Sequence, residues 1–331
     1  MNLLINDCVD QKIWLDLLGN NKFASPFQTP QFYQFYNTIS GYKADVFAVE
    51  DNEQYKALMV VTVQKEKGLK SIFSVRGIVY GGPLLENENE QTIKMLLEGI
   101  KKFYKNKLIY LEIRNHFSYK AYKPIFKKMG YKFQPHLNVQ QHLSDYTPDN
   151  ILSKLGSNKR REVRLSIKAG AKVRITENEE EIETLYHQLA EMYAERVKLP
   201  LPDLSFFKKL SFSDIGKTFL VEHEGNIIGG AFCIYYEGLS INTFYYVGQR
   251  GYHRNIHPTQ LAIYGVLQYA VENNLKMLDF MGAGKPNVDY GVRRFKLQFG
   301  GNLEQDGRFL KVFKPINYEI GKLGVSLMQL I

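Results

Sequence analysis

One run of elements constrains the fold of this chain more than any other feature. It consists of three strand-like segments in direct succession, then a helix and another strand. Only short turns separate the three segments, which predicts an antiparallel meander over residues 218–223, 225–237 and 239–247. A helix over residues 259–273, with Pro258 at its start, and a strand over residues 276–280 follow the meander. Antiparallel strands with helices between them do not form a repeating βαβ pattern, so the sequence predicts an α+β fold.

The length of 331 residues predicts two domains, because a single hydrophobic core rarely grows so large. The first half also contains strands and helices, predicted over residues 45–49, 57–64, 71–79, 108–113 and 139–143 (strands) and 90–104 and 119–129 (helices). The polar, proline-containing segment 144–150 indicates a boundary. We therefore predict domains over residues 1–147 and 148–331.

A weak internal repeat supports two similar domains. The strand 108–113 is followed at a short distance by Phe126, a lysine and then Gly130. The strand 276–280 is followed in the same way by Phe295, Lys296 and Gly300. A recurring order of strand, linker and Phe-Lys pair indicates duplication of one structural unit.

The net charge of +9 predicts an anionic partner, such as RNA, a phosphorylated small molecule or an anionic membrane surface. The two cysteines, Cys8 and Cys233, fit no disulfide or metal-binding spacing. The N-terminal segment has no basic region before an apolar core, and no run of about 18 apolar residues occurs. We therefore expect a cytoplasmic protein without a transmembrane segment, which contacts membranes at most peripherally.

A basic helix predicted over residues 151–169 is the clearest candidate for binding. Arg160, Arg164 and Lys168 are spaced four residues apart, so they share one helix face. Cations so close repel one another unless an anion binds between them, which favours a phosphate-binding ridge for RNA or a nucleotide-linked substrate. The alternative is an ordinary solvated face with Glu162 as a compensating charge.

A glycine-rich turn after the strand 276–280 is the second candidate. Glycine allows a ligand to approach the backbone, and cations and aromatic rings nearby can hold phosphates or stack a base. The predicted binding residues here are Gly282, Gly284, Lys285, Tyr290 and Arg293. The alternative is a surface loop whose Phe295 packs into the core.

A third segment, residues 245–258, weakly resembles the pyrophosphate loop of acetyltransferases, because a Gly- and Arg-containing turn leads into a helix. No phosphate-binding P-loop, no nucleophile elbow and no zinc-protease motif occurs in the sequence. The seven histidines are scattered, so we expect no metal site and no bound cofactor.

Several stretches, in order along nearly the whole chain, resemble the FemA/FemB/FemX family of the acetyltransferase-like (GNAT) superfamily. They are residues 25–29, 82–86, 158–170, 229–233, 279–282 and 295–300. The resemblance implies tandem acetyltransferase-like (acyl-CoA N-acyltransferase-like) domains with mixed, mostly antiparallel sheets. The segment 179–210 is too short for the helical arm of FemA and FemB, so the chain resembles the armless members.

The resemblance implies transfer of an amino acid from aminoacyl-tRNA to an amine of a peptidoglycan precursor, a step of cell wall biogenesis. It places Phe295 and Lys296 at the transfer site. We expect them on a strand, with Lys296 as the ligand contact, since neighbouring strand residues point to opposite faces. The attacking amine requires a proton acceptor, for which Asp279 and Tyr246 are the candidates.

Three functions remain open from the sequence. The first is tRNA-dependent aminoacyl transfer, and the second is N-acyl transfer from acyl-CoA, or from an acyl carrier protein, to an unidentified amine. The third is a non-catalytic RNA- or nucleotide-binding protein. No feature of the sequence indicates a DNA-binding function.

Overall fold

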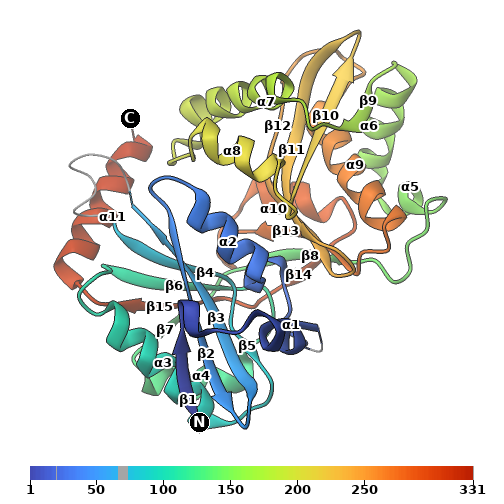
Figure 1. The fold of residues 1–331 in the computed structure, drawn as a ribbon. Coiled ribbons are helices and arrows are strands. Elements are labelled where there is room, and N and C mark those ends of the chain that lie inside the picture. The colour runs from blue at the N-terminus through green and yellow to red at the C-terminus, as the bar shows by residue number, and fades with distance from the viewer. Residues whose placement is uncertain (20, 66–73, 331) are drawn as a thin grey trace. The chain divides into compact units, whose positions relative to one another are not determined.

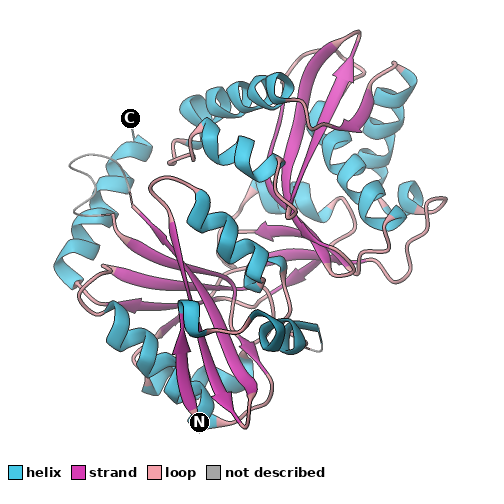
Figure 2. Cartoon of the chain, in the orientation of Figure 1, coloured by secondary structure: helices cyan, strands magenta, loops and turns pink. Residues whose placement is uncertain are grey.

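The computed structural model describes residues 1–19, 21–65 and 74–330, and the chain forms two compact units. Unit 1 consists of residues 1–136 and 305–331, and unit 2 of residues 137–304. Each unit has helices packed on a mixed, mostly antiparallel sheet, so the predicted α+β class is confirmed (Figures 1 and 2). Of the predicted strand 71–79, residues 71–73 lie outside the described residues.

The sheet of unit 1 has the order β1-β2-β3-β4-β6-β15-β7, and β5 pairs with β3. Its strands are β1 (Asn2–Ile5), β2 (Lys43–Asp51), β3 (Gln54–Gln64), β4 (Arg76–Gly81), β5 (Leu84–Leu85), β6 (Tyr110–Asn115), β7 (Lys132–Gln134) and β15 (Arg308–Val312). The β4–β6 pair is parallel. A helix connects these two strands, as parallel pairing requires.

The helices of unit 1 are α1 (Gln11–Gly19), α2 (Pro30–Thr38), α3 (Glu90–Tyr104), α4 (Lys123–Lys128) and α11 (Pro315–Leu330). The connecting helix α3 has the predicted bounds, because its sequence carries both a regular apolar face and an end signal. Asn89 caps its N-terminus, and Lys101 and Lys102 lie in its last turn. None of the helices in the described residues is both long and apolar enough to cross a bilayer.

The sheet of unit 2 has the order β14-β8-β13-β12-β11-β10-β9. Its strands are β8 (Asn138–His142), β9 (Lys172–Ile175), β10 (Gly216–His223), β11 (Asn226–Tyr236), β12 (Ser240–Gly248), β13 (Met277–Gly282) and β14 (Asn302–Glu304). The meander predicted from the sequence is β10, β11 and β12, which pair antiparallel. β12 and β13 are parallel, so this sheet repeats the arrangement of β4 and β6.

The helices of unit 2 are α5 (Ile151–Lys154), α6 (Ser157–Lys168), α7 (Glu179–Met192), α8 (Leu204–Ser211), α9 (Pro258–Glu272) and α10 (Gly291–Leu297). They cover both faces of the sheet. Ala231 and Cys233 of β11 belong to the core cluster that contains α9, whereas Phe232 between them contacts Phe207 of α8. Alternation along the strand therefore directs neighbouring residues to different helices.

The predicted basic helix 151–169 is two helices. Leu155 has an extended backbone, and the N–H of Gly156 donates to the Gln298 carbonyl at 2.8 Å. A Cβ atom at position 156 would lie 3.1 Å from that same carbonyl oxygen, so this close approach favours glycine. A contact with a distant segment thus breaks a helix whose local sequence favours continuation.

Each compact unit includes one strand that the predicted domain limits assign to the other domain. β8 follows β7 in the chain but pairs with β13 and β14 of unit 2. β15 follows β14 but pairs with β6 and β7 of unit 1. The predicted domains 1–147 and 148–331 therefore differ from the compact units, because strand pairing and not the polar segment 144–150 sets the division.

Candidate active site

The parallel strands β12 and β13 pair over a short stretch and then diverge. Their pairing ends at Asn242 and Asp279, although β12 continues to Gly248 and β13 to Gly282. The register of β11 and β12 shifts between Phe232, which pairs with Tyr245, and Cys233, which pairs with Thr243, and such bulges bend and twist a strand. In unit 1, by contrast, β4 pairs with β6 along its whole length. The divergence is thus a feature of unit 2.

Lys296 lies where β13 has left β12. It is on α10, so the predicted strand placement of Phe295 and Lys296 is wrong. Its side chain is buried, and its ammonium group donates to the carbonyl oxygens of Phe280 at 2.5 Å and Gly282 at 2.8 Å. Burial lowers the pKa of Lys296 to about 8, and the nearby Asp279 opposes this shift. A buried ammonium group therefore occupies the diverging end of β13.

Phe295 packs beside Tyr246 of β12. The two rings are stacked with centroids 6.2 Å apart, and Phe299 contacts Phe295 at 5.2 Å. The ammonium group of Lys159 lies 5.2 Å from the Phe295 ring centroid and pairs with Glu162 at 2.5 Å. Phe295 thus contacts both the core and the strand that lines the divergence.

Three tyrosines from separate segments approach one another here. Burial raises the pKa of Tyr246 well above its usual range and that of Tyr193, just after α7, to about 12. In both cases the hydroxyl of Tyr290 adds to the shift, so Tyr290 lies near both groups. At neutral pH Tyr246 and Tyr193 keep their protons, so Tyr246 acts as a hydrogen-bond donor and not as a phenolate base.

Asp279 is fully buried, and both of its oxygens accept hydrogen bonds. One accepts from the Gln140 amide at 3.0 Å, and the other from the backbone N–H of Met281 at 2.5 Å. Met281 has a positive φ of 63°, which is uncommon for a residue with a side chain. Asp279 therefore holds the end of β13 in its conformation. These bonds favour a role in positioning β13 over a role as the acceptor of the proton from the attacking amine.

Arg293 organises the glycine-rich turn and does not project from it. Its guanidinium group donates to four carbonyl oxygens, those of Ala283, Lys285, Pro286 and Val288. At Gly284, where φ is +80°, a Cβ atom would lie 3.0 Å from the Tyr290 ring. Lys285 and Tyr290 are exposed. Of the residues predicted to bind ligand here, these two have side chains that can reach one from the surface.

The three cations of the predicted ridge on α6 differ in their environments. Arg160 is half-buried and donates to the Leu155 carbonyl at 3.1 Å, so it stabilises the break between α5 and α6. Arg164 and Lys168 are exposed, and neither forms an ion pair within the described part of the chain. Arg161, one turn before Arg164, is exposed on the same side. The accessible basic face is therefore Arg161, Arg164 and Lys168.

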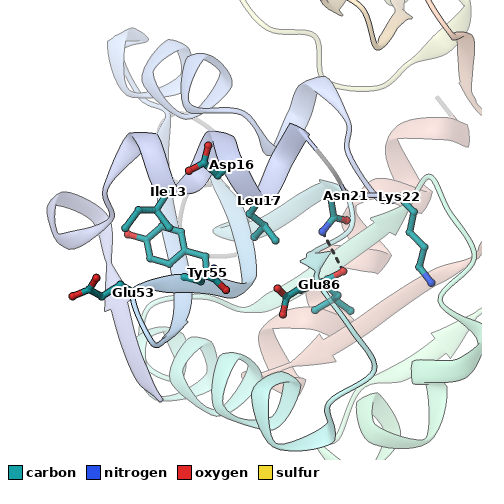
Figure 3. Close-up of a pocket in the computed structure, with 10 residues that line it drawn as sticks. Ile13, Asp16, Leu17, Asn21, Lys22, Glu53, Tyr55 and Glu86 are labelled. Carbon is teal, nitrogen blue, oxygen red and sulfur yellow. Dashed lines mark hydrogen bonds between the residues drawn. The ribbon is translucent and has the colours of Figure 1, made fainter.

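The cavity drawn in Figure 3 lies in unit 1 and does not involve these residues. It has a volume of about 480 Å³ and is lined by Ile13, Asp16, Leu17, Asn21, Lys22, Glu53, Gln54, Tyr55, Leu85 and Glu86. The Asn21 amide donates to the Leu85 carbonyl at 3.1 Å across it. Across the described residues, no cluster of three or more His, Cys, Asp or Glu side chains could hold a metal ion.

The predicted catalytic residues Asp279, Tyr246, Phe295 and Lys296 thus gather around the diverging ends of β12 and β13. Arg160 does not join them, and Arg293 supports the turn. Sequence reasoning missed Tyr193, Lys159 and Gln140, which lie on segments distant in the chain from residues 279–296. No local motif marks these three residues, although Lys159 directly precedes the basic pair 160–161.

Comparisons with known proteins concern the family and the fold of the chain. Residues 153–296 match the family model of the acetyltransferase (GNAT) domain. The crystal structure of FemX has a TM-score of 0.75 at 16% identity, over 97% of this chain and 99% of that chain. L-PGS from Bacillus licheniformis has a TM-score of 0.58 at 15% identity, over 97% of both chains.

A tandem GNAT protein from the clavulanic acid biosynthesis pathway has a TM-score of 0.56 at 11% identity, over 94% of this chain and 99% of that chain. No curated protein matches the chain. The predicted tandem acetyltransferase-like fold and its resemblance to FemX are confirmed. Together these findings support an acyltransferase.

Proposed function

We propose that unit 2 transfers an aminoacyl group from aminoacyl-tRNA to an amine of a peptidoglycan precursor peptide in the cytoplasm. The observation that carries this proposal is the buried ammonium group of Lys296 at the point where β12 and β13 diverge. Diverging strands expose backbone groups to a substrate, and a cation in a dry site stabilises negative charge that develops on a carbonyl oxygen. The resemblance to FemX supports the choice of substrates.

The proposed chemistry is attack of a neutral amine nitrogen on the ester carbonyl carbon of the donor. A C–N bond forms, the C–O bond to the ribose breaks, and the proton that the attacking nitrogen loses passes to the leaving ribose oxygen. Lys296 stabilises the oxyanion, and the Tyr246 hydroxyl, which stays protonated, donates to an oxygen of the reacting group. Asp279 positions β13, and Phe295 forms the wall beside Tyr246.

The second candidate is N-acyl transfer from acyl-CoA, which the GNAT match itself favours. One observation supports the tRNA donor over it. A CoA pyrophosphate would need free backbone N–H groups at the start of α9, and one of the N–H groups there is already bonded within the chain. A Cβ atom at Gly248 would lie 2.5 Å from the Thr259 nitrogen, and the His257 N–H donates to the Ser166 hydroxyl at 2.9 Å. The bond to Ser166 and the close approach of Gly248 leave less room for a phosphate at the start of α9.

We expect the purified chain to transfer label from aminoacyl-tRNA, and not from acetyl-CoA, to a peptidoglycan precursor peptide. The test presents both donors in parallel to a panel of nucleotide-linked and lipid-linked precursors. Transfer from acetyl-CoA alone would replace the first candidate by the second. Failure of both donors with a correctly folded chain would favour a non-catalytic nucleotide-binding protein.

The exposed face of α6 should contribute to tRNA binding through its attraction to phosphates. Replacing Arg164 and Lys168 with glutamine should reduce the slope of log affinity against log salt by roughly 0.7–0.9 for each phosphate that the variant no longer neutralises. Arg160→Gln is the matched control, since its guanidinium group is bonded to Leu155 and half-buried. An unchanged slope in the double variant would show that this helix face is only solvated.

A further inference from the structure

The positive charge of the chain is concentrated in one segment that the candidate active site does not use. Residues 101–132 contain ten Lys and Arg residues and a single acidic residue, Glu112. That excess equals the net charge of the whole chain, +9. Glu112 is already engaged, since Arg114 and Arg308 bind one of its oxygens at 2.6 Å and 2.9 Å. The lysines of the segment therefore have no acidic partner within it.

These lysines lie on neighbouring elements of unit 1. They come from the last turn of α3 and the turn after it, from the 3-10 turn Lys120–Tyr122, from the two ends of α4 and from β7, and α3 packs against α4 (Figure 1). The exposed ones are Lys101, Lys102, Lys105, Lys107, Lys120, Lys127, Lys128 and Lys132. Among described residues, only Lys128 of this set forms an ion pair, with Glu90 at 2.8 Å. We call these eight residues the lysine face.

A hollow with an apolar floor adjoins the lysine face between β1 and α3. Two adjoining cavities of about 490 and 540 Å³ share Leu3, Gly99 and Lys102. Their apolar lining comes from Met1, Leu3, Ile5, Met95 and Phe103, and the lysines around them are Lys94, Lys102, Lys105 and Lys107. Glu98 also lines the first cavity and lies 3.9 Å from the Lys94 ammonium group, so the charge around the hollow is still positive. A Cβ atom at Gly99 would lie 2.2 Å from Leu3, so glycine permits β1 to approach α3.

We infer that the lysine face and the adjoining hollow bind the surface of an anionic phospholipid bilayer. Lysines near such a surface are attracted by the headgroup phosphates, and an apolar hollow ringed by lysines can receive part of a lipid chain. The inference does not depend on the proposed donor or acceptor. If both hold, the transfer takes place at the membrane surface.

The aromatic residues of the segment argue against single-stranded RNA as the partner of this face. Binding of single-stranded RNA uses exposed rings on which bases stack. Here Tyr104, Tyr119, Tyr122, Phe126 and Tyr131 are all buried, and no large hydrophobic residue between 101 and 132 is exposed. Phe103, Tyr110 and Phe117 are half-buried, and the Lys107 ammonium group lies 3.4 Å from the Phe103 ring centroid, where it covers the ring. The lysine face therefore has positive charge but no exposed ring on which a base could stack. This combination favours binding to a bilayer over binding to unpaired bases.

The test is co-sedimentation of the full chain with vesicles of phosphatidylcholine alone or mixed with phosphatidylglycerol, at increasing KCl. We expect binding to the mixed vesicles only, weakening as salt rises. The triple variant Lys102→Gln, Lys105→Gln and Lys107→Gln should bind them about 100-fold more weakly. The matched control removes three cations from α6 by Arg161→Gln, Arg164→Gln and Lys168→Gln, and it should bind like the wild type.

Met95→Gln, which keeps the charge, tests the hollow and should weaken vesicle binding about tenfold. Equal binding to both kinds of vesicle, an equal loss in the α6 control, or full binding by the lysine variant would overturn the inference. A parallel titration of the same variants with tRNA that carries no amino acid tests whether the lysine face binds RNA. Loss of tRNA binding in the lysine variant, without any vesicle binding by the wild type, would assign the face to RNA instead.

Discussion

Replacing Lys296 with methionine should lower the rate of aminoacyl transfer by about 10- to 100-fold. The side chain keeps its length but loses the charge that we place beside the developing oxyanion. Losing one charge-assisted hydrogen bond in the transition state costs roughly 1.5–3 kcal/mol. The measurement is single-turnover transfer from labelled aminoacyl-tRNA at saturating acceptor.

The same substitution should change stability little at neutral pH. It leaves the carbonyls of Phe280 and Gly282 without their donor, which is unfavourable, but it also removes a charge whose burial is unfavourable. These opposing contributions are each on the order of a few kcal/mol. A rate loss without a large fall in the melting temperature therefore separates the chemical role of Lys296 from a structural one.

The pH dependence of the transfer rate and of the free energy of unfolding tests the charge state of Lys296. If the ammonium form is the active one, the rate should fall as pH rises through about 8, the pKa of Lys296. Because burial lowers this pKa, the unfolded chain keeps the proton up to its higher ordinary value. The free energy of unfolding should therefore rise between about pH 8 and pH 10.5, and Lys296→Met should abolish that rise.

Lys127 provides the matched control. It follows Phe126 on α4 as Lys296 follows Phe295 on α10, but it is exposed. Lys127→Met should leave both the rate and its pH dependence unchanged. A wild-type rate in Lys296→Met would remove the transfer site from this position. A rate that increases through pH 8 in the wild type but not in Lys296→Met would make Lys296 a base.

Replacing Phe309 with alanine should destabilise unit 1 by about 3–5 kcal/mol. Phe309 lies on β15, is 1% exposed, and stacks on Phe126 with ring centroids 4.1 Å apart. It also contacts Phe133 at 5.5 Å. The loss should appear in urea unfolding and as reduced hydrogen-exchange protection of the strands that flank β15, namely β6 and β7.

The control for this variant is Leu303→Ala on β14, where the side chain is 40% exposed. We expect it to change stability by less than about 0.5 kcal/mol. The result that would contradict the strand assignment is a loss of protection in β13 and β14 of unit 2, with β6 and β7 unchanged in Phe309→Ala.

The sequence by itself determined the elements whose signals are local. Several elements lie close to their predicted positions, namely the meander β10–β12, the helices α3 and α9 and the strand β13. Their apolar periodicity and end signals lie within the segment itself, so no distant residue is needed to recognise them. The sequence also marked Phe295 and Lys296 as a pair, and the residues around 279–282 as a turn of special geometry.

Only the tertiary structure decided which sheet each strand joins, where the basic helix breaks and which side chains are buried. β8 and β15 carry ordinary strand patterns, and nothing in their sequences specifies which sheet they join. The break at Gly156 arises from its bond to Gln298, and Lys296 is buried because β13 departs from β12 and leaves carbonyls for its ammonium group. Each of these outcomes depends on contacts between residues far apart in the chain, whose free energies exceed the weak local preferences that a sequence pattern reports.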